Sequence, residues 1–563
     1  MTSIWKKTVS NKGAGMGFIK YIDIDWPDLF RPILTSKTNF FNRIRVRREV
    51  IPIIFVPGAM GSRLKHGKKV VWDPDDRVGM FNRYGRKKCT PAKRKELLIG
   101  PQFDPEWLQV SEDDAKHNQK FFSMTDPWRD HRGWGGVLWT YYGELLEELQ
   151  NYNWNKPVSS GDKDKKKELA GKCFEFPVHA FGYNWTDSCA NSGKKLAKKI
   201  DEIIKGYKAK GRLCKHVILV THSMGGLVAR SACCIKHQQI GKAQDNVLGV
   251  IHGVQPAVGA AAAYWRMKAG FERTGIVSTI SAWVLGASGE EVTCLLGNAP
   301  GGLELLPTKD YIANDGSKQW LHVTLKNGKQ ISLPKSDPYT EIYRIGEQTN
   351  MITNKLDAPF WRLVNPEWLD PTDTGAKRRK SNITDPWVEY VTCLSLAEKF
   401  HKNLRTQFHK STYQFYSDGL GTVDKINFKH EEFFYRKQPT LGVEIVVPSR
   451  VVSSRGKSIM YTDIYNQEIT APLSEPHKTL VASMSSIDDY REGGDGTVPN
   501  CSGSALKECD GSKILFTSKF NKIEHQEVYN ERKGKDFVIK AVRNFALKRI
   551  EEGIKEGGVG AAN

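Results

Sequence analysis

An apolar run that leads into a serine, and then directly into a helix-forming stretch, carries the clearest chemical information in the chain. Val217 to Val220 are apolar, and the sequence continues Thr-His-Ser-Met-Gly-Gly over residues 221–226. A serine at the tip of a tight strand-to-helix turn has a strained backbone and an exposed hydroxyl, an arrangement called a nucleophile elbow. The alternative, a buried strand followed by an ordinary helix with an incidental serine, is disfavoured by the small residues of this turn. Ser223 is therefore our candidate nucleophile.

Small residues two before and two after such a serine let the strand and the helix approach each other. Gly225 fits the second of these positions. Thr221 occupies the first, where glycine is usual, and so departs from the pattern. The threonine side chain needs slightly more space than glycine, but the pattern still predicts an elbow.

Attack by a serine on an acyl carbonyl creates a negative oxygen, which backbone N–H groups must stabilise. The amide of Met224, at the start of the predicted helix, is one candidate donor. A second is expected from a loop after an early central strand. Here the apolar run Ile51 to Val56 ends in the glycine-rich loop 57–62, and we assign the donor to Ala59. Taken alone, that loop would be an ordinary strand-ending turn.

The base should follow the serine and the acid in the chain, on the loop after the last strand. His525 follows the predicted final buried strand, 513–518, and fits this place. An alternative for His525 is a capping role at the start of the last helix. His222, beside the serine, is a rival base, but adjacent side chains on an elbow diverge, so we expect it to shape the pocket instead.

Two carboxylates compete for the role of the acid. Asp418 comes just after a predicted strand over 412–416, a position that many hydrolases use. Asp495 lies in Gly-Gly-Asp-Gly-Thr-Val-Pro, closer in sequence to His525. The acid must hold the imidazole tautomer, which calls for a carboxylate fixed in a rigid turn. We choose Asp495 and keep Asp418 as the alternative.

Alternation of predicted strands and helices indicates a parallel sheet with helices on both faces. Together with the residue order Ser, Asp, His, it predicts an α/β-hydrolase fold with large inserted cap or lid domains. The strand predictions include 174–181 and 247–254, with predicted helices over 137–151 and 192–208. The predicted divisions are an N-terminal extension (1–50), the start of the hydrolase core (51–64), an insertion over the active-site face (65–132), the core with the elbow (133–256), a cap or lid insertion (257–409), a core strand (410–417), a second insertion (418–490) and the end of the core with acid and base (491–563).

Within the caps, two features stand out. Gly275 to Ala287 is apolar on most faces, which is typical of either a lid that contacts lipid or a buried helix. Segments 322–325 and 330–333 flank an Asn-Gly pair and predict a hairpin.

Composition limits the partners and the cofactors. Lys and Arg exceed Asp and Glu by 84 − 63 = 21, so the surface should attract anions such as phospholipid headgroups, and no nucleic-acid motif accompanies the basic runs. Such runs are equally compatible with a solvated surface. The ten cysteines form no zinc-type pairs and are expected to be reduced, while Cys501 and Cys509 could pair in an oxidising space. Serine chemistry needs no metal and no organic cofactor.

Membrane contact is expected to be peripheral. No window approaches the roughly 18–20 uninterrupted apolar residues that span a bilayer. Lys6 and Lys7 have no apolar stretch behind them, so no secretory signal peptide is expected and synthesis in the cytoplasm is predicted.

Taken together, Ile-Ile-Phe-Val-Pro-Gly-Ala-Met-Gly-Ser (53–62), Thr-His-Ser-Met-Gly-Gly (221–226), Gly-Asp-Gly-Thr-Val-Pro (494–499) and His525 resemble the lecithin:cholesterol acyltransferase-like and GPI inositol-deacylase-like lipases. The resemblance is greatest to the lipase effectors that bacteria deliver by type VI secretion. It covers the catalytic scaffold and leaves the caps unassigned. It implies that Asp495 is the acid and that Ala59 takes part in oxyanion binding.

The resemblance also implies a biological setting. Such effectors are made in the bacterial cytoplasm without a signal peptide and are secreted by a contact-dependent system. They act as antibacterial toxins on the phospholipids of the target cell from its periplasm. Expected partners are the membrane phospholipid substrate, a cognate immunity or inhibitor protein, and a component of the secretion apparatus. The alternatives are a lipid acyltransferase of the same fold and a catalytically silent protein that binds membranes.

Overall fold

The computed structural model gives the placement of most of the chain. It describes residues 20–27, 42–85, 89–112, 132–155, 170–237, 241–271, 285–286, 288–324, 328–346, 361–371, 385–433, 451–452, 459–460, 477–484 and 493–558. Of the apolar segment Gly275 to Ala287, only Leu285 and Gly286 fall within these ranges. The rest of the predicted lid segment lies outside the described residues.

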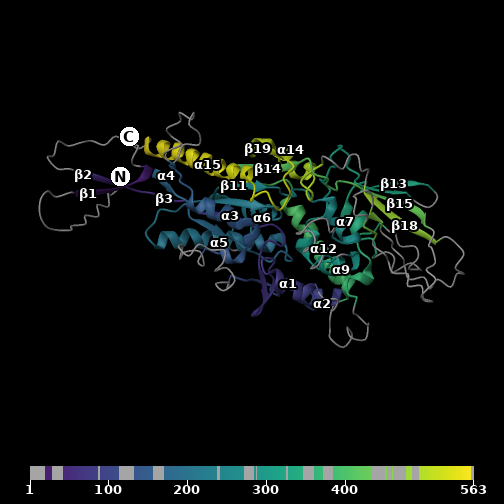
Figure 1. Ribbon diagram of the computed structural model, residues 1–563. Coiled ribbons are helices and arrows are strands. Elements are labelled where there is room, and N and C mark those ends of the chain that lie inside the picture. Colours follow the sequence, from purple (N-terminus) through teal and green to yellow (C-terminus); the bar gives the residue numbers. More distant parts are fainter. Residues whose placement is uncertain are drawn as a thin grey trace.

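A six-stranded sheet in the order β19-β14-β11-β10-β4-β9 forms the centre of the protein (Figure 1). Neighbouring strands run parallel throughout. The strands are β4 (Ile53–Val56), β9 (Val178–Ala180), β10 (Val217–His222), β11 (Val247–Gly253), β14 (Thr412–Asp418) and β19 (Ile514–Asn521). The parallel sheet predicted from the sequence is confirmed.

Both faces of this sheet are covered by helices. Successive residues of a strand point to opposite faces, and Ile54 and Phe55 accordingly belong to two different buried hydrophobic clusters. The cluster of Ile54 includes residues of α5 and α6, and the cluster of Phe55 includes residues of α3 and α15. A sheet buried on both faces explains why its central strands are continuous apolar runs. The covering helices are α3 (Trp139–Asn151), α5 (Cys189–Ala209), α6 (Gly225–Cys234) and α15 (Arg532–Gly558).

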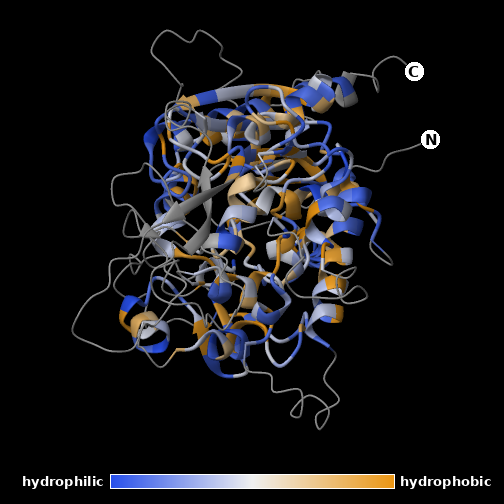
Figure 2. Ribbon diagram, turned by 90° about the vertical axis from the view of Figure 1, so that its right-hand side faces the viewer, coloured by the Kyte–Doolittle hydropathy of each residue, from blue (hydrophilic) through white to orange (hydrophobic). Residues whose placement is uncertain are grey.

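Helix α5 shows why these segments are helical. Its buried residues, which include Leu196, Ile200 and Ile204, recur at the spacing of one helix face, and lysines occupy the opposite face. Ser188 caps its first turn by accepting a hydrogen bond from the amide of Ala190 at 3.1 Å. Figure 2 shows the same division, with hydrophilic and hydrophobic residues on different sides of the surface helices.

Two strand predictions need correction. The final strand was expected to be buried, but β19 is an edge strand that pairs only with β14 on one side, and Leu515 and Phe516 are each 43% exposed. The strand predicted over 174–181 is broken at Pro177, since proline cannot donate to a strand ladder. Its first part, β8 (Phe174–Glu175), pairs with β3 (Glu49–Val50), and its second part is β9.

The two long insertions meet in one cap sheet, in the order β13-β12-β15-β18. The predicted hairpin is present as β12 and β13, which pair antiparallel. Strand β12 also pairs with β15, which follows β14 and is therefore a later part of the chain. The predicted insertions 257–409 and 418–490 thus contribute to a single cap (Figure 1). The cap strands are β12 (Leu321–Thr324), β13 (Gln330–Leu333), β15 (Ile426–Phe433) and β18 (His477–Met484), and its helices include α7 (Ala261–Ala269), α9 (Gly289–Leu296), α10 (Pro300–Leu303) and α12 (Pro386–Leu404).

The remaining strands and helices lie outside the sheet and the cap. Strands β5, β6 and β7 form a small antiparallel sheet directly after the loop that follows β4. Their bounds, with the adjacent helices and the N-terminal pair, are β1 (Lys20–Asp25), β2 (Asn42–Arg47), β5 (Leu64–His66), β6 (Lys69–Trp72), α1 (Arg77–Tyr84), α2 (Pro91–Leu98) and β7 (Gln109–Val110). No helix among the described residues is long and apolar enough to cross a membrane.

A buried arginine on α6 joins the cap to the core. Arg230 is 2% exposed, and its guanidinium donates to the backbone carbonyls of Ala257, Arg405 and Gln407 at 3.1, 2.8 and 2.9 Å. Ala257 follows β11, where the chain leaves the core, and the other two residues follow α12, where it returns. One side chain therefore binds both ends of the first insertion, because the guanidinium of arginine presents several donors in a planar fork.

A buried glutamate after α10 makes a second connection. Glu304 accepts hydrogen bonds from the Ser188 hydroxyl at 2.5 Å and from the Cys189 amide at 2.7 Å, at the start of α5. Its side chain is fully buried, and burial raises its pKa to about 8, although these donors act in the opposite direction. The folded protein therefore holds a proton on Glu304 more tightly than the unfolded chain does.

Replacement of Glu304 should change how stability depends on pH. A carboxyl whose pKa is higher in the folded state contributes stability that is present below its ordinary value of 4.5 and is lost as the pH rises through about 8. Glu304→Gln has no proton to lose, so we expect a flatter dependence of the unfolding free energy on pH, measured by urea denaturation. Glu202→Gln, on the exposed side of α5, should behave like the wild type. An unchanged slope in Glu304→Gln would contradict the assignment.

Candidate active site

Ser223 lies between β10 and α6 with a left-handed backbone, at φ +50°. Its amide donates to the carbonyl of Gly253 in β11 at 2.9 Å, which fixes the turn to the neighbouring strand. The approach of helix and strand is close, because a Cβ atom on Gly225 would lie 2.4 Å from the carbonyl oxygens of both Val56 and Pro57. Only glycine fits at this position, and the geometry is that of a nucleophile elbow.

Thr221, which stands where glycine is usual, directs its hydroxyl toward the neighbouring strand β11. Its hydroxyl lies 2.9 Å from Nδ1 of His252 and 3.4 Å from the carbonyl oxygen of Ile251, both in the adjacent strand β11. Its backbone carbonyl accepts a hydrogen bond from the Tyr529 hydroxyl at 2.7 Å. The larger side chain is accommodated because its polar atom has partners and does not face the helix.

His525 and Asp495 form a buried pair. Nδ1 of His525 lies 2.7 Å from Oδ2 of Asp495, and the His525 amide donates to the Asp495 carbonyl at 3.0 Å. The other carboxylate oxygen of Asp495 accepts from the amides of Thr497 and Val498 at 3.0 and 2.7 Å. A carboxylate held in this way keeps the proton on Nδ1 and leaves Nε2 as the basic nitrogen. The rings of His525 and His222 are 5.1 Å apart, so His525, the candidate base, lies beside the elbow.

Asp418, the alternative acid, has different partners. One of its oxygens lies 3.0 Å from Nζ of Lys519, and the other accepts from the amide of Gly419 at 2.8 Å. Burial acts to raise the pKa of Asp418, but hydrogen bonds from Asn500 and Lys519 outweigh it and hold that pKa below its usual value. The imidazole of His525 is therefore bound by Asp495, while Asp418 forms a surface ion pair.

The loop after β4 lies directly against the serine. A Cβ atom on Gly58 would be 3.0 Å from the Cβ of Ser223. The loop closes as a tight turn, in which the Gly61 amide donates to the Gly58 carbonyl at 3.0 Å and Met60 takes a φ of +63°. Ala59 lies within this turn and is partly exposed. Its amide and that of Met224 are the oxyanion donors that the sequence analysis expects.

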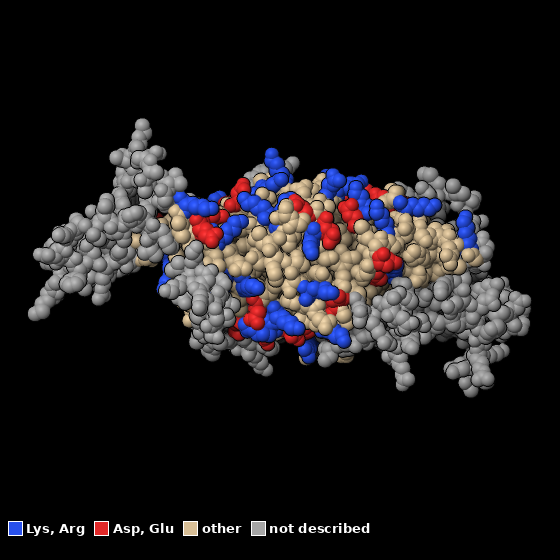
Figure 3. Space-filling model, turned by 90° about the horizontal axis from the view of Figure 1, so that it is seen from above, with Lys and Arg blue, Asp and Glu red and all other residues tan. Residues whose placement is uncertain are grey.

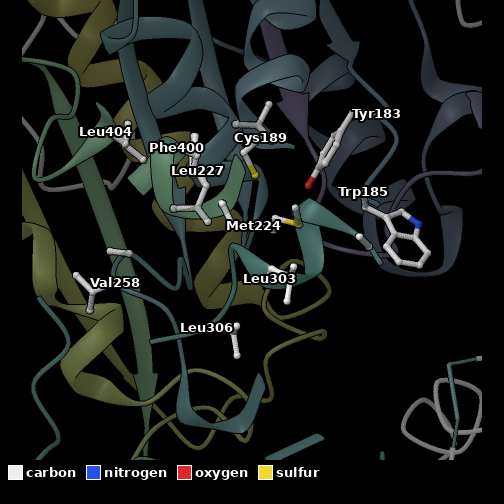
Figure 4. Packing of buried hydrophobic residues seen from close by; sticks show 14 of the residues in the cluster. Tyr183, Trp185, Cys189, Met224, Leu227, Val258, Leu303, Leu306, Phe400 and Leu404 are labelled. Atoms are coloured by element: carbon white, nitrogen blue, oxygen red, sulfur yellow. The ribbon is translucent and has the colours of Figure 1, made fainter. Parts of the chain in front are cut away.

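The cap covers the site. Ser223, Asp495 and His525 are 8%, 2% and 5% exposed. Gly301 in α10 is so close to the elbow that a Cβ atom there would lie 3.0 Å from Cε of Met224. Figure 4 shows the apolar side chains that meet around the start of α6, which include Met224 and Leu227 from the elbow helix and Leu303, Leu306, Phe400 and Leu404 from the cap. Ser223, the candidate nucleophile, is thus buried next to apolar side chains of the cap.

Sequence reasoning missed the contribution of Tyr142. The Tyr142 hydroxyl lies 3.0 Å from Nδ1 of His222 and 3.3 Å from the amide of Gly58. The helix that carries it was predicted, but no sequence pattern indicates which of its polar atoms meets the elbow. His222, expected to shape the pocket, also contacts the backbone carbonyl of His525 through Nε2, at 2.8 Å.

Neither a metal-binding cluster nor a disulfide is found among the described residues. Among the described residues, no group of three or more His, Cys, Asp or Glu side chains is arranged to hold a metal ion. All ten cysteines are described and free, Cys501 and Cys509 among them.

Comparison with known proteins supports the fold. Residues 162–261, which include β9, α5, β10, the elbow and β11, match the PGAP1-like alpha/beta domain family. A chain in the crystal structure of the Tle4-Tli4 complex is similar over 89% of this chain and 99% of its own length, with 24% sequence identity and a TM-score of 0.64. Phospholipase PlaB from Legionella pneumophila aligns over 68% and 90% of the two chains, at 10% identity and a TM-score of 0.18, too low to support an argument. No curated protein matches. The α/β-hydrolase fold predicted from the sequence is confirmed.

The two candidate acids can be separated by substitution. Asp495→Asn should lower kcat for a short soluble ester by on the order of 10⁴-fold, because an amide stabilises the wrong tautomer of His525. Asp418→Asn is the matched control and should lose far less, since it breaks only the contact with Lys519. The measurement is steady-state hydrolysis by each purified variant. The opposite ranking would move the acid to the end of β14.

Proposed function

We propose that this protein is a serine esterase that hydrolyses acyl ester bonds of membrane lipids, with phospholipids as its substrate. The observation that carries the proposal is Ser223 at φ +50°, directly after His222, whose ring lies 5.1 Å from that of His525, the partner of the buried Asp495. A serine on a strained turn together with an imidazole oriented by a carboxylate is the arrangement by which unrelated hydrolases activate serine. The fold and the order of these residues in the chain agree with it.

The proposed reaction uses these groups in two steps. Nε2 of His525 takes the proton of Ser223 as Oγ attacks the acyl carbonyl, and Asp495 stabilises the imidazolium that forms. The amides of Met224 and Ala59 bind the oxyanion of the tetrahedral intermediate. Protonation of the leaving alcohol by His525 releases it and leaves an acyl-serine. Water, activated by His525, then frees the fatty acid and restores the serine.

A lipid substrate is supported by the surroundings of the nucleophile. Met224, next to Ser223, belongs to a buried hydrophobic cluster that includes side chains of the cap, and apolar surroundings of this kind suit a long acyl chain. The excess of 21 positive charges favours binding to anionic lipid. On the face in Figure 3, Lys and Arg are interspersed with Asp and Glu and do not gather in one patch, so attraction to a membrane would be spread over the surface.

A role as an antibacterial effector is part of the same proposal. It rests on the resemblance to type VI lipase effectors, and the similar chain of the Tle4-Tli4 complex supports it because that chain was solved together with a second protein. We propose delivery into the periplasm of a target cell and inhibition by a dedicated immunity protein of the producing cell.

Removal of the nucleophile tests the enzymatic part. Ser223→Ala should abolish release of fatty acid from mixed phospholipid vesicles, to below about 10⁻³ of the wild-type rate, with the fold intact. A fluorophosphonate should label the wild type and not the variant, since only an activated serine reacts. Lipid analysis with and without an added alcohol separates hydrolysis from acyl transfer. Normal hydrolysis by a folded Ser223→Ala protein would refute the assignment.

Salt tests the membrane part. Each basic residue near an anionic surface contributes about 1 kcal/mol, and this attraction decays over about 8 Å at physiological ionic strength. Binding of Ser223→Ala protein to anionic vesicles, measured by sedimentation, should therefore weaken steeply between low and high salt. Binding to neutral phosphatidylcholine vesicles provides the control and should change little. Equal salt dependence on both vesicles would exclude an electrostatic contribution.

A further inference from the structure

A chain of buried hydrogen bonds connects the loop after β4 with the loop that carries the base. It runs from the amide of Gly58 to the hydroxyl of Tyr142 at 3.3 Å, from that hydroxyl to Nδ1 of His222 at 3.0 Å, and from Nε2 of His222 to the carbonyl of His525 at 2.8 Å. Its members come from four separate segments of the chain. They meet at one point beside Ser223.

Chemistry fixes the direction of every bond in this chain. The carbonyl of His525 can only accept, so Nε2 of His222 carries the proton and donates it. Nδ1 of the neutral ring is then an acceptor, and the Tyr142 hydroxyl donates to it. The oxygen of Tyr142 in turn accepts from the Gly58 amide. Burial, with a contribution from His525, lowers the pKa of His222 to about 3, so the ring stays neutral at physiological pH.

The surroundings leave these groups little freedom. Tyr142 and His222 are 3% and 4% exposed. The ring of Tyr142 packs against Phe55, with ring centres 4.7 Å apart. A Cβ atom on Gly58 would lie 2.7 Å from Nδ1 of His222, and one on Gly61 would lie 2.6 Å from the Tyr142 oxygen. The loop after β4 can therefore reach this position only because both residues are glycines.

We propose that Tyr142 and His222 are positioning residues that hold the oxyanion loop and the base loop in a fixed relation to each other. Gly58 immediately precedes Ala59, the proposed oxyanion donor, and the backbone of His525 carries the proposed base. A shift of either loop would move the donor that binds the carbonyl oxygen relative to the base that takes the proton of Ser223. The proposal rests on the proposed function and adds to it two residues that touch no substrate.

Tyr142→Phe tests the proposal with the smallest change. It deletes one hydroxyl and leaves the Gly58 amide and Nδ1 of His222 without that partner in a buried position. We expect kcat for a soluble ester to fall about 10- to 100-fold, with KM changed less than about twofold, because the loss is felt mainly in the transition state. Tyr141→Phe makes the same chemical change one residue away, outside this chain of hydrogen bonds, and should retain the wild-type rate.

Two substitutions of His222 separate the effects of its two contacts. His222→Gln can place a donor where Nε2 was, toward the carbonyl of His525, whereas His222→Ala loses both contacts. We expect His222→Gln to recover part of the kcat that His222→Ala loses. Addition of Tyr142→Phe to His222→Ala should cost little more, because the chain of bonds is already broken, and such non-additivity is the mark of coupled residues. Thermal unfolding of each variant ensures that only folded protein is compared.

A spectroscopic measurement keeps the test independent of turnover. Nitrogen chemical shifts of ¹⁵N-histidine protein, with the His222 signal identified from its loss in His222→Gln, should show the Nε2–H tautomer down to about pH 5, and the Nδ1 signal should move in Tyr142→Phe. Wild-type kcat in folded Tyr142→Phe, additive losses in the double variant, or an Nδ1–H tautomer would each overturn the proposal. If no Ser223-dependent hydrolysis exists at all, the proposed function fails, and the tautomer alone decides on the chain of bonds.

Discussion

A serine held at a φ of +50° must be stabilised by its neighbours, because a non-glycine residue in the left-handed region costs about 1–2 kcal/mol. The bond from its amide to Gly253 and the contact of Gly225 with the end of β4 oppose this cost. Both require that β4, β10 and β11 keep their register and that α6 begins directly after the turn. This backbone conformation of Ser223 therefore depends on the parallel sheet, on the helices that cover its two faces and on the small residues of the elbow.

Surroundings, and not residue type, separate the histidines near the serine. His525 has a carboxylate on Nδ1. His222 has a hydroxyl and a carbonyl as partners, and His252 a threonine hydroxyl, and burial lowers the pKa of both to about 3. Among these three rings, only that of His525 has a carboxylate as its partner.

Much of the fold and the candidate site was predictable because the signals are local. The apolar run before Ser223, the glycines around it and the glycine-flanked Asp495 each occupy a few consecutive residues. The edge position of β19 was not predictable, because an apolar strand has the same sequence whether it has one neighbour or two. The pairing of β12 with β15 and the contact of Tyr142 with the elbow are equally hidden. They depend on segments that approach only after folding.

The contacts of Arg230 bear on whether the first insertion could be removed from the protein. Since one guanidinium binds the carbonyls of Ala257, Arg405 and Gln407, the two ends of the first insertion lie within the span of a single side chain. Adjacent ends are the condition under which an insert can be excised and its flanks joined by a short linker without redirecting the strands. However, β12 of that insert pairs with β15, which enters from elsewhere in the chain. Excision of the chain between Ala257 and Arg405 would therefore leave the central sheet connected but expose an edge of β15 that the intact protein keeps paired.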